Sequence, residues 1–234
     1  DDSVTLVLDY AYIHYDKIYD SDIVNGKLEE YDWLHLLQED FTGQYGKFYA
    51  SYRSYPWYKQ QVADAEALAA SLGFNKVSKL KLAVAQSIKN FVIGGGFLFT
   101  MCSGTDSFDN SLAAQNTDIC EVMYDGDPAR PNCQKELDFS QTFAFEDFQL
   151  ERDPLKYEYS SIDGTDLRRR QGIRETTDKF TLFDFSAKWD VVTTMLTQCH
   201  TNIINGFMGQ TTDFMKEYIK PNVLVMGENQ ALGT

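Results

Sequence analysis

The stretch FVIGGGFLFTMCSG, residues 91–104, decides what fold this sequence predicts. It begins at the end of an apolar helical pattern, and three glycines follow. Residues 96–101 then form a short apolar run with the length of a buried strand. At Cys102, Ser103 and Gly104 this strand passes into the next expected helix. A thiol at such a turn projects out of the sheet, and the following helix N-terminus favours a thiolate. The stretch therefore predicts a nucleophile elbow centred on Cys102.

The segments on either side of the elbow alternate between helix and strand. Helical spacing of apolar residues predicts helices at 60–72, 78–91 and 106–114. The run YDWLHLL, residues 31–37, predicts a second buried strand. Strands that are separated by helices pair in parallel. We therefore expect an α/β fold, with a mostly parallel sheet flanked by helices.

The rest of the chain has weaker patterns. A helix is expected after the cap formed by residues 1–3, and short strands are expected at 15–19, 180–185 and 222–226. Residues 115–178 contain turn sequences and alternating phenylalanines, which predict an irregular insertion with some antiparallel strand. We expect a single domain over residues 1–234 that belongs to a longer polypeptide.

The composition excludes several classes of function. A net charge of −14 repels a phosphate backbone, so nucleic-acid binding is not expected, and residues 168–170 (RRR) are interpreted as a solvated loop. No apolar run reaches the roughly 20 residues of a membrane span, so no transmembrane segment is predicted. No glycine-rich phosphate loop is present, and we predict no cofactor.

The cysteines lack the spacing of a zinc site, and no metal site is predicted. Cys120 and Cys133 flank a turn-rich stretch. They pair in an oxidising compartment or stay as two buried thiols, and the second alternative is favoured. Asp125 and Asp127 have the spacing of part of a calcium loop, but the other ligands of such a loop are missing, which favours a simple turn.

Residues 91–104 resemble the nucleophile-elbow region of class I glutamine amidotransferase-like proteins, which include the ThuA-like group. The stretches YDWLHLLQEDFTGQYGKF, GGGFLFTMCSGTDSFD, DGDPARPNCQ and FMGQTTDF are similar to a group of exported bacteroidete proteins labelled asparagine synthetase B. Those proteins lack the synthetase domain that the label implies. The resemblance spans nearly the whole chain. It implies a flavodoxin-like sheet with Cys102 at the carboxyl ends of the strands, and export to the periplasm or cell surface.

The resemblance also implies how the site works. Cys102 would attack an amide, and the strand-end loop at 35–40 would lie beside it, where relatives place the backbone groups of an oxyanion hole. The sequence departs from the family pattern at two points. Thr100 stands where the elbow usually has glycine, and no His-x-Glu pair completes a triad. The resemblance places the missing histidine beyond residue 234.

Eight residues are candidates for the site. The catalytic candidates are Cys102, Gly104, Glu39 and His35, and the substrate-binding candidates are Asp40, Ser103, Asp106 and Tyr45. Each type of residue also has a structural interpretation. Cysteine and histidine are often core residues, acidic loops are often solvated, and an aspartate near a helix start is often a cap. The aromatic residues at 45–58 suit a sugar or peptide, or simply pack their own loop.

Two functions remain in competition. The first is a Cys-dependent hydrolase or amidotransferase-like enzyme that acts on a small amide or a sugar derivative. The second is a catalytically inactive relative that binds a glycan or a protein partner, within a larger assembly. A reactive, solvent-reachable Cys102 near an imidazole favours the enzyme. A buried Cys102 with an exposed aromatic face favours the binding module.

Overall fold

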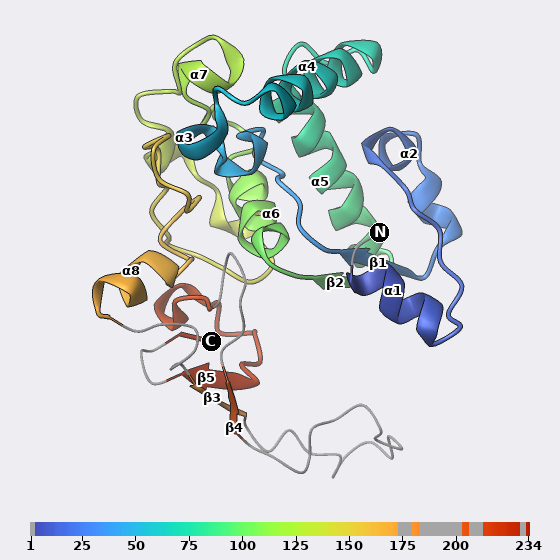
Figure 1. Ribbon diagram of the computed structural model, residues 1–234, viewed down its shortest axis with the longest axis vertical. Helices are drawn as coiled ribbons and strands as arrows, with labels where there is room; N and C mark the ends of the chain where they lie inside the picture. Colours follow the sequence, from blue (N-terminus) through green and yellow to red (C-terminus); the bar gives the residue numbers. More distant parts are fainter. Residues whose placement is uncertain (1–2, 173–178, 183–202, 206–212, 230–232) are drawn as a thin grey trace.

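The computed structural model describes residues 3–172, 179–182, 203–205, 213–229 and 233–234, and Figure 1 shows their arrangement. Its α-helices are α1 (Ser3–Tyr10), α2 (Asp20–Val24), α3 (Tyr49–Tyr52), α4 (Pro56–Ser71), α5 (Val77–Ile93), α6 (Ser103–Ala113), α7 (Val122–Asp125) and α8 (Thr165–Arg170). Its 3-10 helices are η1 (Lys27–Glu30), η2 (Tyr45–Lys47), η3 (Cys133–Glu136), η4 (Phe139–Gln141) and η5 (Lys216–Tyr218). Its strands are β1 (Trp33–Leu36), β2 (Phe97–Thr100), β3 (Lys179–Leu182), β4 (Ile203–Asn205) and β5 (Gly227–Asn229).

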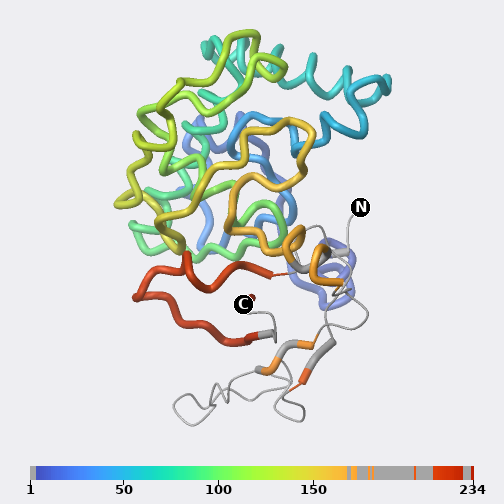
Figure 2. The backbone as a smooth tube through the Cα atoms, turned by 90° about the vertical axis from the view of Figure 1, so that its left-hand side faces the viewer, coloured from blue at the N-terminus to red at the C-terminus, as the bar shows by residue number. Residues whose placement is uncertain are grey.

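The described strands form two sheets of different type. β1 and β2 pair in parallel, with Leu36 opposite Thr100, and the chain between them contains α4 and α5. This pair confirms the α/β character that the sequence predicts. β3 pairs antiparallel with both β4 and β5, in the order β4-β3-β5. Figures 1 and 2 show β3, β4 and β5 at one end of the molecule, beyond the helices that surround β1 and β2.

Several predicted elements have different bounds in the structure. The helix expected from residue 106 begins at Ser103, so Asp106 lies inside its first turn and the prediction of a cap is wrong. The strand expected at 15–19 is wrong, because these residues have no regular secondary structure and lead into α2. The strand expected at 222–226 is also wrong, since β5 starts at Gly227.

Two further predictions lie towards the C-terminus. β3 covers the first residues of the strand expected at 180–185, and residues 183–185 lie outside the described ranges. The arginines at 168–170 end α8 and do not form a loop. There Arg170 pairs with Asp166 one turn away, at 2.5 Å. Opposite charges four residues apart on a helix attract each other and stabilise a short helix such as α8.

The main core lies between α5 and the parallel strands. α5 buries Leu80, Val84 and Ile88, which recur every four residues and so share one face of the helix. They belong to the same apolar cluster as Leu34 of β1 and Leu112 of α6. This packing fixes the carboxyl ends of β1 and β2 against the start of α6, and it thereby positions the elbow.

Two buried charged side chains anchor the irregular region between α6 and α8. The Asp109 carboxylate is 1% exposed and accepts the backbone N–H groups of Phe143, Ala144 and Phe145 at 2.8, 2.8 and 2.9 Å. Lys47 is also 1% exposed, and its ammonium donates to the carbonyl groups of residues 151 and 153 at 3.0 and 3.3 Å. These contacts hold residues 143–153 against α6 and η2.

Candidate functional site

Cys102 occupies the turn between β2 and α6. It is the N-cap of α6, with φ 54° and ψ −141°, and its side chain is partly buried. Few residues other than glycine adopt positive φ, and such a conformation costs about 1–3 kcal/mol. The strand, the strained cysteine and the helix therefore form the turn that the sequence predicts around residues 96–104.

Thr100 stands where glycine is usual in this type of turn. Its Oγ1 lies 3.0 Å from Oγ1 of Thr105, in the first turn of α6. The two hydroxyls form a hydrogen bond that joins the end of β2 to the helix. The threonine is thus accommodated by a polar contact across the turn.

The loop after β1 lies against the first turns of α6. Ser107 donates its hydroxyl to the Glu39 carbonyl at 2.9 Å, and Ser103 does so at 3.4 Å. A Cβ built on Gly104 would lie 3.5 Å from the Glu39 nitrogen, so the missing side chain lets the two backbones approach. Glu39 and Gly104, predicted as neighbours of Cys102, are brought together here.

The backbone N–H groups of this junction differ in their availability. The Gly104 N–H donates to the Met101 carbonyl at 3.2 Å. The N–H groups of Ser103 and Glu39 donate to no acceptor within the described ranges. These two groups, and not Gly104, are therefore the available donors for a developing oxyanion.

A cavity of about 520 Å³ opens beside this junction. Four of the sequence candidates line it: Glu39, Asp40, Tyr45 and Ser103. Cys102 and Gly104 flank Ser103 in the chain. The structure therefore gathers six of the eight candidates at one place, at the carboxyl ends of the parallel strands.

Lys81 of α5 is a member of the cavity wall that the sequence did not single out. Its ammonium pairs with Asp20 at 2.8 Å and with the carboxylate of Glu39. Burial raises the pKa of the Glu39 carboxyl, and Lys81 opposes that shift. Burial alone would lower the pKa of Lys81, but Glu39 and Asp20 raise it above its usual value. The only feature of the sequence that could have pointed to Lys81 is that a lysine interrupts the apolar face of a predicted helix.

Asp40 and Tyr45 shape the loop beside the cavity. The Asp40 carboxylate accepts the Thr42 N–H at 2.7 Å, the Thr42 hydroxyl at 2.6 Å and the Gly46 N–H at 2.8 Å. Both of its oxygens thus hold the turn in place. Tyr45 is 6% exposed with φ 52°, and burial raises the pKa of its hydroxyl. The loop at residues 40–46 is therefore packed into the interior. The alternative interpretation of the sequence, an acidic loop that is simply solvated, does not fit this packing.

His35 and Asp106 lie outside the cavity wall. His35 is on β1, opposite Phe99, with the two ring centroids 4.9 Å apart. Asp106 is 1% exposed, and burial raises the pKa of its carboxyl, with Asp163 adding to the shift. No histidine lines the cavity in the part of the chain that the structure describes.

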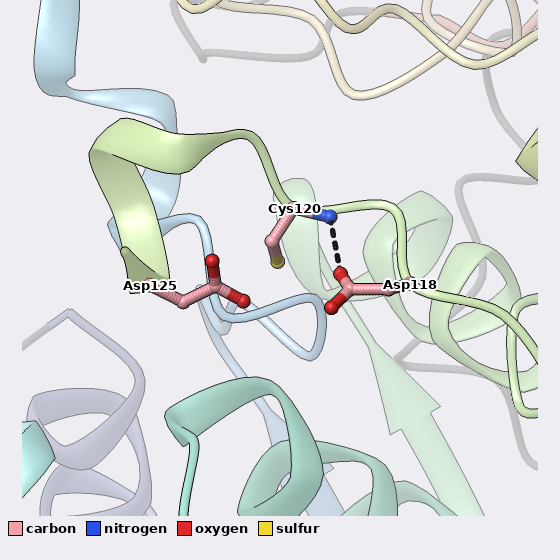
Figure 3. Close-up of side chains that lie close together, drawn as sticks. All are labelled: Asp118, Cys120 and Asp125. Carbon is pink, nitrogen blue, oxygen red and sulfur yellow. Dashed lines mark hydrogen bonds between the residues drawn. The ribbon is translucent and has the colours of Figure 1, made fainter. Parts of the chain in front are cut away.

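A second cluster of polar side chains lies away from the elbow (Figure 3). Asp118, Cys120 and Asp125 each place one potential metal ligand atom within 4.8 Å of the others. The Lys76 ammonium already pairs with Asp118 at 2.7 Å, with Asp125 at 3.0 Å and with Asp127 at 2.5 Å. The lysine supplies the positive charge that the carboxylates need. We interpret the cluster as an ion-pair network that ties the start of α5 to residues 118–127.

The described cysteines differ in exposure. Cys120 and Cys133 are fully buried, whereas Cys102 is partly exposed, and none of the three forms a disulfide. The Cys120 thiol donates to the Thr42 carbonyl at 3.1 Å, and burial raises its pKa. A water-borne reagent therefore reaches Cys102 more readily than Cys120 or Cys133.

No known protein family, curated protein or solved structure matches this chain. Within the described ranges, no helix combines the length and the apolar character that crossing a bilayer requires.

Proposed function

We propose that the protein is a Cys-dependent hydrolase or amidotransferase-like enzyme that acts on a small amide or a sugar derivative. The observation that carries this proposal is the backbone of Cys102, with φ 54° at the N-terminus of the 11-residue helix α6. We also propose that the protein has the flavodoxin-like fold of the class I glutamine amidotransferase-like (ThuA-like) proteins, as the resemblance implies. The resemblance further implies that the protein is exported.

The strain at Cys102 supports a functional role. Glycine would adopt this conformation at little cost, so a cysteine there needs a reason other than folding. The turn aims a side chain away from the sheet, and the positive end of α6 favours a negative charge next to it. The first effect makes the sulfur accessible to a substrate, and the second favours the thiolate, which is the nucleophilic form.

The groups beside Cys102 suit acyl transfer. In the proposed reaction the thiolate attacks a carbonyl carbon, and the N–H groups of Ser103 and Glu39 receive the oxyanion. The C–N bond then breaks, and the amine leaves with a proton taken from water. A water molecule next hydrolyses the thioester, which releases the carboxylic acid and restores the Cys102 thiol. The cavity of about 520 Å³, with charged residues and Tyr45 in its wall, suits a small polar substrate.

A binding module is the second candidate, and one observation favours it. The outer face of the parallel strands exposes three aromatic rings: Trp33 is 53%, Phe97 is 59% and Phe99 is 43% exposed. Exposed apolar surface of this kind often binds a glycan or a protein partner. In this alternative Cys102 is a structural residue.

The rate at which iodoacetamide labels Cys102 separates the two candidates. We expect iodoacetamide at pH 7 to label Cys102 clearly faster than a free thiol such as glutathione, because the N-terminus of α6 favours the thiolate form of a cysteine. Labelling is followed by mass spectrometry. Cys102→Ser is the control, since it retains the other cysteines. A rate no higher than that of glutathione would favour the binding module.

Replacement of Cys102 by glycine tests the strain directly. We expect Cys102→Gly to raise the free energy of unfolding by about 1 kcal/mol, because glycine adopts positive φ without strain but loses more chain entropy on folding. Cys102→Ala retains the Cβ and is the matched control, with little expected change. Urea unfolding measures both variants. Equal stability of the two variants would mean that the turn is unstrained.

A further inference from the structure

An aromatic cluster, formed by Phe48, Tyr52, Tyr55 and Trp57, lies at one end of the cavity. Phe48 lines the cavity, and its ring centroid lies 5.8 Å from that of Tyr52 and 6.3 Å from that of Trp57. The centroids of Tyr52 and Trp57 are 5.0 Å apart, and those of Tyr52 and Tyr55 are 5.6 Å apart. All four contacts are T-shaped or tilted, which is a favourable geometry for pairs of rings. The rings therefore hold one another in place, and the cluster continues outward from the cavity wall.

Trp57 lies on the face of α4 that forms part of the cavity wall. Three residues of this helix line the cavity: Gln61, Ala65 and Leu68. Trp57 precedes Gln61 by four residues, and residues three or four apart share one face of a helix. Trp57 therefore extends this row of wall residues by one turn, towards the start of α4.

Three rings of the cluster are open to solvent. Tyr52 is 39%, Tyr55 is 50% and Trp57 is 45% exposed. The next ring along α4, that of Tyr58, is only 5% exposed and belongs to the main core. Single exposed rings are common on protein surfaces, but adjacent exposed rings beside a cavity are typical of a binding surface. The exposed rings of the cluster are therefore available to a ligand that enters the cavity.

The charges of the cavity wall indicate which kind of ligand fits beside these rings. Among the described wall residues, the carboxylates of Asp20, Glu39 and Asp40 outnumber the single ammonium, that of Lys81. Such a wall repels an anionic ligand. Carboxylates only accept hydrogen bonds, so the wall favours a ligand with many hydroxyl donors. A neutral sugar has such donors around its ring, and the C–H groups of its ring faces pack on aromatic rings. A peptide has only one backbone donor per residue, and it fits this wall less well.

We propose that the aromatic cluster binds a neutral sugar ring, which packs on Trp57 and Tyr52, and that the cavity receives an amide group carried by this sugar. The inference rests on the proposed function, and it narrows the substrate class to a neutral sugar with an amide substituent. The sugar lies at the outer end of the cavity wall, and the amide lies towards the junction of Ser103 and Glu39. The cluster contributes binding and orientation, and no bond forms or breaks there.

The test is the binding of chitohexaose, a neutral oligosaccharide of N-acetylated sugars, measured by titration calorimetry. We expect the wild type to bind it and Trp57→Ala to bind it about tenfold more weakly, because the variant lacks the ring on which the sugar packs. Trp57→Phe retains an aromatic ring and should keep most of the affinity. Trp33→Ala is the matched control, since it removes a tryptophan that is 53% exposed on β1, away from the cavity wall. This control should bind like the wild type.

The outcomes separate this inference from the proposed function. Iodoacetamide labelling tests the Cys102 nucleophile without any sugar, so either proposal can fail while the other stands. Thermal melting confirms that each variant is folded, and Tyr52→Ala is a second variant that should also weaken binding. The inference is overturned if chitohexaose does not bind to the wild type. It is also overturned if Trp33→Ala loses as much affinity as Trp57→Ala, since the sugar would then lie on the outer face of the parallel strands.

Discussion

Replacing Asp109 by alanine should lower the free energy of unfolding by about 3 kcal/mol, since it leaves three buried N–H groups without an acceptor. The carboxylate is 1% exposed and accepts the N–H groups of Phe143, Ala144 and Phe145 at 2.9 Å or less. These three residues belong to the irregular region between α6 and α8. Chemical denaturation of the wild type and the variant, monitored by circular dichroism, measures the loss.

Asp138→Ala is the control for Asp109→Ala. Asp138 also accepts a backbone N–H, from Ser140 at 3.0 Å, but it does so in an exposed turn where water can replace it. We expect a clearly smaller loss for this variant. If the Asp109 variant lost no more stability than the Asp138 variant, residues 143–145 would have other acceptors, and Asp109 would not be their anchor.

The elbow was predictable because its signals are local. An apolar run after glycines marks a buried strand, and the strand's length and the following Ser-Gly pair locate the turn at Cys102. β2 and α6 meet there as expected. The neighbouring loop was predictable for a similar reason, because the carboxyl ends of parallel strands meet at one edge. Glu39 and Ser103 therefore lie in one cavity wall.

The predictions that were wrong depended on contacts between distant parts of the chain. Residues 15–19 were predicted as a short strand, but in the described part of the chain they belong to neither sheet. Asp106 has the sequence position of a cap, yet α6 starts three residues earlier and draws its side chain into the interior. Lys81 joins the cavity wall from α5, far along the chain from its partner Glu39, and no local sequence pattern predicts such a long-range contact.

Replacing Asp106 by asparagine should stabilise the protein at pH 8 by about 2 kcal/mol, because a neutral amide avoids the cost of an ionised carboxylate in the interior. Burial raises the pKa of Asp106 in the folded state above its unfolded value. A group of this kind favours the folded state below its unfolded pKa of about 3.9, and this contribution is lost as the pH rises through the folded pKa. Wild type and variant should therefore be similar at pH 4 and should diverge towards pH 8.

Asp138→Asn provides a control of opposite sign for Asp106→Asn. Its pKa is lowered by the Ser140 hydroxyl, so the charged form favours folding and its loss should destabilise the protein above pH 4. Urea unfolding at pH 4, 6 and 8 measures both variants. If Asp106→Asn were destabilising at pH 8, the carboxylate would have partners that offset its burial.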